Sequence, residues 1–172
     1  VWVGGDWFTD NGREPIVVRR KVGSDEWLQE TLPKKPDDPF PSGRFKQLFD
    51  AKASTDGQSM WMVGLMQGNA PAYAYATSSD GGDTFTWTWG HAGVQGDPYL
   101  NAIGATGTDG IYIAGDYARL RVWNGIKWKQ AVTSVTKFPL IAPFYAIGGS
   151  ADDLWFVGED VALHRVASKI QP

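Results

Sequence analysis

The sequence predicts an all-β protein made of repeated four-stranded antiparallel sheets, and three observations lead to this prediction. The 172 residues are 13% aromatic, with nine Trp, 21 Gly and 10 Pro, a composition typical of short strands joined by tight turns. One pattern of apolar strands and acidic turns recurs along the chain. No segment keeps a helical period of 3.6 residues beyond about two turns.

The recurring unit is clearest in the second half of the chain. Ala102-Ile103-Gly104 is followed by an acidic turn and an apolar strand, and Ala146-Ile147-Gly148, 44 residues later, is followed by the same two features. An aromatic residue marks the apolar strand in every copy: Trp2, Trp61, Tyr112 and Trp155. The last two are 43 residues apart, within the roughly 40–45 residues of a propeller blade. We assign the longer earlier spacings to insertions at residues 32–43 and 90–98.

Each copy divides into strands named a to d in chain order. The expected blade units are residues 1–32, 44–90, 99–133 and 144–172, of which the first lacks strand a and the last lacks strand d. Strand a is expected at 45–51, 99–105 and 144–149, strand c at 16–20, 72–77, 120–123 and 162–166, and strand d from Trp27, Phe85 or Trp128. Strand b carries the aromatic, and the glycine after it is expected to permit a sharp turn.

A sheet of four short strands cannot bury both of its own faces. Stacking one sheet on the next covers a face of each, and repetition around an axis leaves only short edges. The predicted fold class is therefore all-β, with β-propeller blades of four antiparallel strands and about four blade units in a single domain. Because the two ends overlap in strand type and Val1 lies in mid-strand, we expect part of a larger propeller of about six to eight blades. The remaining blades would come from the same precursor or from a second copy. The alternative is a closed propeller of four blades in which each end blade lacks one strand.

The most specific motif lies between strands c and d of the second unit. The segment Ser78-Ser79-Asp80-Gly81-Gly82-Asp83-Thr84-Phe85 fits the pattern Ser-x-Asp-x-Gly-x-Thr-aromatic, with Ser78, Asp80, Gly82, Thr84 and Phe85 as its structural residues. Asp80 is expected to accept hydrogen bonds from N–H groups of the turn, glycine to supply positive φ, and Phe85 to pack beneath the hairpin. The motif resembles the Asp-box, or BNR repeat, of sialidases, sortilin-type receptors, photosystem II assembly factors and secreted bacterial propellers.

This resemblance extends over nearly the whole chain and implies a function. It implies a secreted, periplasmic or cell-surface bacterial protein that serves as a non-catalytic scaffold for an unknown protein or glycan ligand. The alternative is a divergent sialidase-like glycoside hydrolase or a carbohydrate-binding propeller. Arg13-Glu14-Pro15-Ile16 is similar to the Arg-Ile-Pro segment of sialidases, but Glu14 departs from that pattern. The sequence does not identify a tyrosine nucleophile together with the acidic residues that would support it. No catalytic residue is therefore assigned.

Tryptophans are the candidate ligand contacts. Trp87 and Trp89 alternate with threonines, so both side chains face the same side of strand d. They stack on a sugar ring or, in the interpretation we favour, pack against a neighbouring blade. Trp7 and Phe8 are placed in the loop after strand b and are further candidates for exposure.

Composition argues against several other classes of function. The net charge of −3 and the pI near 5.3 give no basic excess for nucleic acid, and the run Arg19-Arg20-Lys21 is interpreted as a solvated strand end. With no cysteine, thiolate catalysis and cysteine-ligated zinc are excluded. His91 and His164 do not form a metal pair, so no metal or cofactor is expected. No apolar run approaches the roughly 18 residues of a membrane span.

Overall fold

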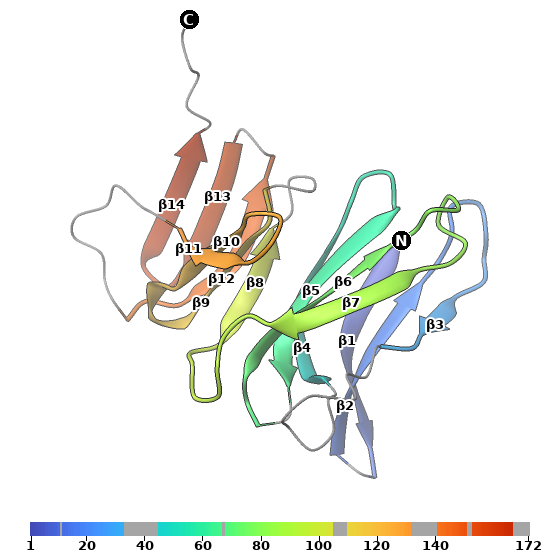
Figure 1. Ribbon diagram of the computed structural model, residues 1–172, viewed down its shortest axis with the longest axis horizontal. Helices are drawn as coiled ribbons and strands as arrows, with labels where there is room; N and C mark the ends of the chain where they lie inside the picture. The colour runs from blue at the N-terminus through green and yellow to red at the C-terminus, as the bar shows by residue number, and fades with distance from the viewer. Residues whose placement is uncertain are drawn as a thin grey trace, which may run out of the picture. The chain divides into compact units, whose positions relative to one another are not determined.

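The computed structural model describes residues 1–10, 12–32, 45–66, 68–104, 110–131, 141–150 and 153–166. Over these residues the chain is all-β, as predicted, and its strands form four antiparallel sheets (Figure 1). A single turn of 3-10 helix, η1 (Asp116–Ala118), is the one helical segment in this described part. The same part contains no helix with the length and apolar character needed to cross a membrane.

Each sheet is built from strands that are consecutive in the chain. Sheet 1 contains β1 (Trp2–Thr9), β2 (Gly12–Arg19) and β3 (Leu28–Glu30), and sheet 2 contains β4 (Phe45–Ala53), β5 (Ser59–Met66), β6 (Pro71–Thr77) and β7 (Thr86–His91). Sheet 3 contains β8 (Leu100–Gly104), β9 (Tyr112–Gly115), β10 (Leu120–Trp123) and β11 (Trp128–Gln130), and sheet 4 contains β12 (Phe144–Gly149), β13 (Asp153–Gly158) and β14 (Val161–Val166).

The hairpin of β1 and β2 is longer than the sequence predicted. Pairing continues from Trp2 opposite Arg19 to Thr9 opposite Gly12. The expectation of a loop after strand b was therefore wrong, because Trp7 and Phe8 lie within β1 and Arg13 lies within β2. Gly4, Gly5 and Asp6 interrupt the apolar pattern of β1, and much of the strand is solvated, so no continuous strand signal is visible in the sequence.

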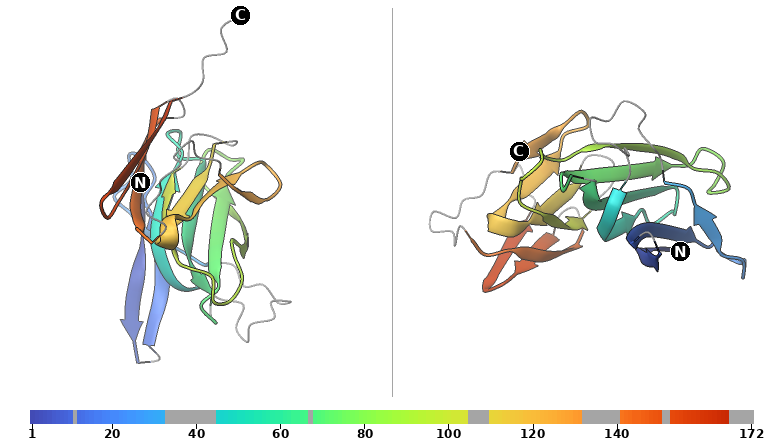
Figure 2. Two further views of the ribbon diagram at one scale, coloured as in Figure 1. Left: turned by 90° about the vertical axis from the view of Figure 1, so that its left-hand side faces the viewer. Right: turned by 90° about the horizontal axis from the view of Figure 1, so that it is seen from below.

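The chain divides into two compact units, Val1–Tyr99 with sheets 1 and 2, and Leu100–Pro172 with sheets 3 and 4. In the first unit, sheet 1 packs face to face on sheet 2 through contacts of β1 and β2 with β4 (Figure 2). Since side chains alternate along a strand, Met60 and Met62 of β5 face this core, while Trp61 and Val63 are buried on the other side of the same sheet. The buried core comprises Val17, Phe45, Leu48, Met60, Met62, Met66, Ala72 and Ala74.

The second unit repeats this layered packing. Sheets 3 and 4 meet through contacts of β12 with β8 and β9, and their shared core comprises Ala102, Tyr112, Ala114, Leu120, Phe144, Ile147, Leu154 and Phe156. Phe156 lies between Tyr112 and Phe144, with ring centroids 5.5 and 6.3 Å away. Edge-to-face contacts of this kind add about 0.5–1.5 kcal/mol to the burial of the rings.

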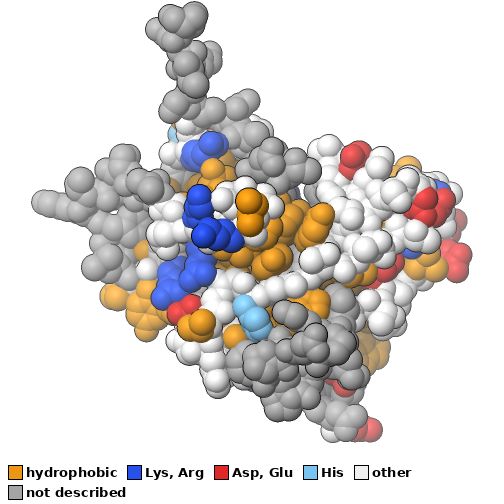
Figure 3. Space-filling view, viewed as in Figure 1, with side chains coloured by type: hydrophobic (Ala, Val, Ile, Leu, Met, Phe, Trp, Pro, Cys, Tyr) orange, Lys and Arg blue, Asp and Glu red, His pale blue; other side chains and the backbone are white. Residues whose placement is uncertain are grey.

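Lysines and arginines lie over the last hairpin of sheet 3. Figure 3 shows basic side chains gathered over the hairpin of β10 and β11. This hairpin carries Arg121 in β10, Lys127 in the turn and Lys129 in β11. β11 is the edge strand of its sheet, and basic side chains on an edge discourage pairing with another chain.

A buried arginine joins sheet 1 to sheet 2. Arg19 is only 8% exposed and forms an ion pair with Glu30, while its Nη1 and Nη2 donate to the carbonyls of Gly82 (3.0 Å) and Asp83 (2.7 Å). Trp87 Nε1 donates to the other carboxylate oxygen of Glu30 (3.3 Å). The prediction of a solvated strand end was therefore wrong for Arg19. The rigid fork of a guanidinium can satisfy a carboxylate and two carbonyls at once, so its burial is compensated.

Replacing Arg19 with Met should lower the free energy of unfolding by roughly 3–5 kcal/mol, because Glu30 would be left buried without its ion pair. Urea unfolding monitored by tryptophan fluorescence measures this loss. Lys21→Ala is the matched control, since Lys21 pairs with Asp83 at the exposed surface, and its effect should be below about 1 kcal/mol. Equal losses for the two variants would show that Arg19 is not the interface anchor.

Candidate functional site

Three sheets repeat one irregularity at the start of their first strand. Each of these strands begins with a large buried residue: Phe45, Leu100 or Phe144. The following residue has no partner in the strand pairing and forms a β-bulge: Lys46, Asn101 or Tyr145. Bulges redirect a side chain and are frequent beside functional sites.

Each bulged residue interacts with the turn between the second and third strands of its own sheet. Lys46 Nζ donates to Asn69 Oδ1 (3.0 Å), and Asn101 Nδ2 donates to Asp116 Oδ1 (2.9 Å). The Tyr145 hydroxyl lies close enough to the Glu159 side chain for their interaction to raise the pKa of the phenol. One polar pair therefore recurs at the same end of three sheets.

Glycines in the second strands make room for this arrangement. A Cβ on Gly64 would lie 2.1 Å from the carbonyl oxygen of Gln47, and one on Gly158 would lie 2.0 Å from that of Pro143. Neither glycine has a positive φ, so the sharp turn expected at these positions is not their role. They are needed because the backbone at the first strand passes too close for any side chain.

Sheets 3 and 4 bring two of the polar pairs into one group, Asn101, Asp116, Tyr145 and Glu159, called here the Tyr145 cluster. Desolvation by neighbouring protein atoms, the charge and hydrogen bond of Glu159, and the charge of Asp116 raise the pKa of the Tyr145 phenol above its usual value of 10.0. The phenol is therefore a neutral hydrogen-bonding group at physiological pH, held beside two carboxylates.

The backbone before β12 holds this cluster in place. Three consecutive carbonyls, of Ala142, Pro143 and Phe144, each accept one hydrogen bond. The donors are Ala118 N (3.0 Å), Glu159 N (3.0 Å) and Asn101 Nδ2 (3.3 Å). The turn after β9, the turn after β13 and the start of β8 are thus all hydrogen-bonded to residues 142–144. This shared attachment preorganises the polar side chains of the cluster.

The turn at η1 is strained. Tyr117 and Ala118 both have left-handed backbone conformations, with φ of 53° and 54°, although neither is glycine. Such conformations cost energy and are concentrated at functional sites. Tyr117 and Tyr145 are 61% and 59% exposed, so two accessible rings accompany the carboxylates of this cluster.

The donor set suits hydroxyl-rich ligands better than metals. Carboxylates, an amide and a phenol can accept from and donate to hydroxyl groups, and tyrosine rings can pack on the apolar faces of sugars. Within the described residues, no group of three or more His, Cys, Asp or Glu side chains is placed to hold a metal ion.

The hairpin of Ser78 to Phe85 has the internal hydrogen bonds expected of its sequence. Asp80 accepts from the N–H groups of Asp83 (3.0 Å) and Thr84 (3.0 Å) and from Thr84 Oγ1 (2.5 Å), and Ser78 Oγ accepts from Gly82 N (2.8 Å). Gly82 has a φ of 94°. These hydrogen bonds, led by those of Thr84, lower the pKa of Asp80 well below its usual value of 3.8.

A second hairpin, which the sequence analysis did not identify as a motif, uses the same chemistry. Between β4 and β5, Asp56 Oδ1 accepts from Ser54 Oγ (2.5 Å) and Gln58 N (2.9 Å), which lowers its pKa, and Ser54 Oγ accepts from Ser59 N (2.9 Å). The shared signal is a serine two residues before the aspartate, Ser54-x-Asp56 and Ser78-x-Asp80.

The tryptophans named as candidate ligand contacts have different environments. Trp87 and Trp89 are half-buried and pack against the core of sheets 1 and 2, with Trp2 6.1 Å from Trp87 between ring centroids. These contacts support the packing interpretation. Trp7 is 61% exposed and lies in β1, within the unit of sheets 1 and 2.

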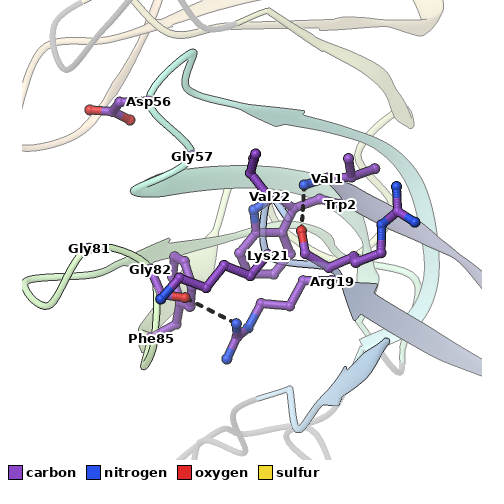
Figure 4. Close-up of a pocket in the computed structure, with 11 residues that line it drawn as sticks. Val1, Trp2, Arg19, Lys21, Val22, Asp56, Gly57, Gly81, Gly82 and Phe85 are labelled. Carbon is purple, nitrogen blue, oxygen red and sulfur yellow. Dashed lines mark hydrogen bonds between the residues drawn. The ribbon is translucent and has the colours of Figure 1, made fainter. Parts of the chain in front are cut away.

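A pocket of about 220 Å³ lies beside the Ser78–Phe85 hairpin, between residues 19–22 and the glycines Gly57, Gly81 and Gly82 (Figure 4). Phe85 contributes to it and contacts both the Trp2 ring, at 4.7 Å, and the Arg19 guanidinium, at 5.0 Å. Three side-chain cations line the pocket, and each has an acidic partner: Arg19 pairs with Glu30, Lys21 with Asp83, and Arg20 lies 4.0 Å from Asp25. The Val1 ammonium donates to the Arg20 carbonyl (2.8 Å). The pocket is therefore explained as part of the interface between the two sheets.

No family model matches this chain, and no curated protein is significantly similar to it. The geometry of the Tyr145 cluster and the repeated architecture around it are therefore the features that bear on function.

Asp80→Asn should destabilise the first unit more at about pH 7 than at about pH 3. Because the folded-state pKa of Asp80 is lowered, its stabilising contribution is complete above the unfolded-state pKa and is lost as the pH falls toward the folded-state value. Thermal unfolding of both proteins across this range tests the effect. Asp83→Asn in the same hairpin is the control, and a melting-temperature difference for Asp80→Asn that is independent of pH would contradict the assignment.

Proposed function

We propose that the four sheets are consecutive blades of a β-propeller, and that the chain is a non-catalytic scaffold which binds a glycan at the Tyr145 cluster. The proposal is supported by the face-to-face packing of successive sheets within each unit and by the recurring sequence pattern. The Ser78–Phe85 hairpin adds to it, since its hydrogen bonds are those that the Asp-box resemblance implies.

The repeated bulge is the observation that supports this proposal most strongly. In a propeller the first strand of each blade is innermost and faces the central channel. Within the second unit, Asn101 and Tyr145 would then lie at one end of that channel, each paired with a residue from the adjacent turn. Lys46 holds the equivalent position in sheet 2 and pairs with Asn69. Sheets 3 and 4 both contribute polar pairs to this place, which suits it to ligand binding.

The charges of the cluster favour one class of glycan. Asp116 and Glu159 are both carboxylates, which would repel an anionic sugar and attract hydroxyl or ammonium hydrogens. We therefore infer a neutral or amino-sugar ligand. This inference disfavours sialic acid, the substrate class that the sialidase resemblance would imply.

A glycan array followed by titration calorimetry tests this proposal. Tyr145→Phe and Asp116→Asn should each weaken binding of a neutral or amino-sugar hit about tenfold, the effect of losing one hydrogen bond worth about 1.4 kcal/mol. Trp7→Ala is the control and should bind with unchanged affinity. Loss of binding in Trp7→Ala with retention in Tyr145→Phe would instead locate the ligand on sheet 1.

A glycoside hydrolase is the second candidate, and one specific observation favours it. Tyr145 lies close to Glu159 and within the field of Asp116, so a phenol, a potential base and a second carboxylate are brought together. Fluorogenic glycosides distinguish the two functions. Turnover that Glu159→Gln abolishes would establish catalysis, whereas binding without turnover supports the scaffold.

Exposed apolar side chains on sheets 1 and 4 indicate which surfaces of the chain would contact a partner. Val3 and Trp7 are 51% and 61% exposed on sheet 1, and Trp155 and Val157 are 44% and 48% exposed on sheet 4. We propose that further blades, from the same precursor or from a second copy, cover these faces, and that the protein acts outside the cytoplasm of a bacterium. Sedimentation velocity of the purified chain tests self-association through these faces.

A further inference from the structure

The first strand present in sheet 1 corresponds to the second strand of the other sheets. β1 contains Trp2-Val3-Gly4-Gly5, and β5 contains Trp61-Met62-Val63-Gly64. In sheets 2, 3 and 4 the corresponding strands, β5, β9 and β13, each lie between two hydrogen-bonded neighbours, whereas β1 is the edge strand of sheet 1 among the described residues.

A glycine lies three residues after the marker aromatic in all four strands: Gly5, Gly64, Gly115 and Gly158. For Gly64 and Gly158 the structure supplies the reason, since a Cβ there would collide with a carbonyl at 2.1 or 2.0 Å, from the backbone at the first strand. Gly5 differs, because nothing lies within 4 Å of the position its Cβ would take.

Nothing in the local backbone of Gly5 requires glycine. Its φ is not positive. Glycine within a strand is unfavourable, because it loses more conformational freedom on folding than other residues and has no side chain to pack. At Gly5, β1 therefore leaves the same space, free of a side chain, that the backbone at the first strand occupies beside Gly64 in sheet 2 and Gly158 in sheet 4. We call this space the recess at Gly5. The edge of β1 beside it is where such a strand would pair.

We propose that the edge of β1 is a binding site for an extended peptide segment with the first-strand pattern of this chain. β8 and β12 define that pattern: a large apolar residue, a bulged residue with a polar group, then Ala-Ile-Gly. β4 shares the leading apolar residue and the bulged polar residue but continues with Gln47 and Leu48. The segment pairs antiparallel with β1, buries its leading apolar residue and places its backbone in the recess at Gly5. Strand addition of this kind gains affinity from main-chain hydrogen bonds and specificity from alternate side chains.

A tethered segment tests this site in the full chain. The β12 sequence Phe-Tyr-Ala-Ile-Gly-Gly, joined ahead of Val1 by a flexible Gly-Ser linker, reaches an effective concentration of about millimolar. We expect a higher melting temperature and at least about tenfold slower hydrogen exchange of β1 amides, which become protected by ladder hydrogen bonds. A scrambled segment on the same linker is the control. No difference between the two segments would overturn the proposal.

Gly5→Ala separates strand addition from a general effect of the linker. In the untethered chain it should leave stability unchanged or slightly higher, because the added methyl group enters open space and alanine costs less conformational entropy than glycine. In the tethered protein it should remove the protection of β1. Protection that survives Gly5→Ala would show that the segment binds elsewhere and would overturn the assignment of the recess.

Discussion

A sheet of three or four short strands cannot exclude water from its own faces, and the packing of one sheet on the next is the constraint on which the rest of this structure depends. In the first unit this contact combines an apolar core around Met60 and Met62 with a buried ion pair between Arg19 and Glu30. The core supplies most of the stabilisation through burial. The ion pair fixes how the two sheets align, since Arg19 also bonds to two carbonyls of the Ser78–Phe85 hairpin.

The candidate site is a consequence of the same packing. A first strand that presses against its neighbour needs glycines such as Gly64 and Gly158 opposite it, and the bulge at its start displaces one polar residue from the strand ladder. In the second unit the displaced residues Asn101 and Tyr145 meet the turns that carry Asp116 and Glu159. The β-bulge recurs because the sheets pack in the same way, and the polar residue that it displaces differs from sheet to sheet. The same position can therefore carry a different chemical group in each sheet.

Local features were predictable from the sequence and long-range ones were not. The strands and the Asp80 hairpin follow from alternation and turn residues over fewer than about ten positions. The Tyr145 cluster draws on four separate segments, and a β-bulge depends on pairing that no local pattern reveals. Arg19 was assigned to solvent because it lies in a basic run, whereas its burial depends on Glu30 and on carbonyls more than sixty residues away. Glycine at a constant distance from each aromatic was visible in the sequence, but its reason required the structure.

Disulfide trapping tests the stacking of sheet 1 on sheet 2 most directly, because the chain has no cysteine. A Cβ on Gly4 would lie 3.8 Å from the Cβ of Ala51 in β4, which matches the separation of about 3.8 Å in disulfides. Gly4→Cys with Ala51→Cys should form an intramolecular disulfide under mild oxidation, detected by mass spectrometry. Gly5→Cys with Ala51→Cys, whose new side chain points to the opposite face, should not. Failure of the first pair to cross-link, or equal cross-linking of both pairs, would contradict the packing of these sheets.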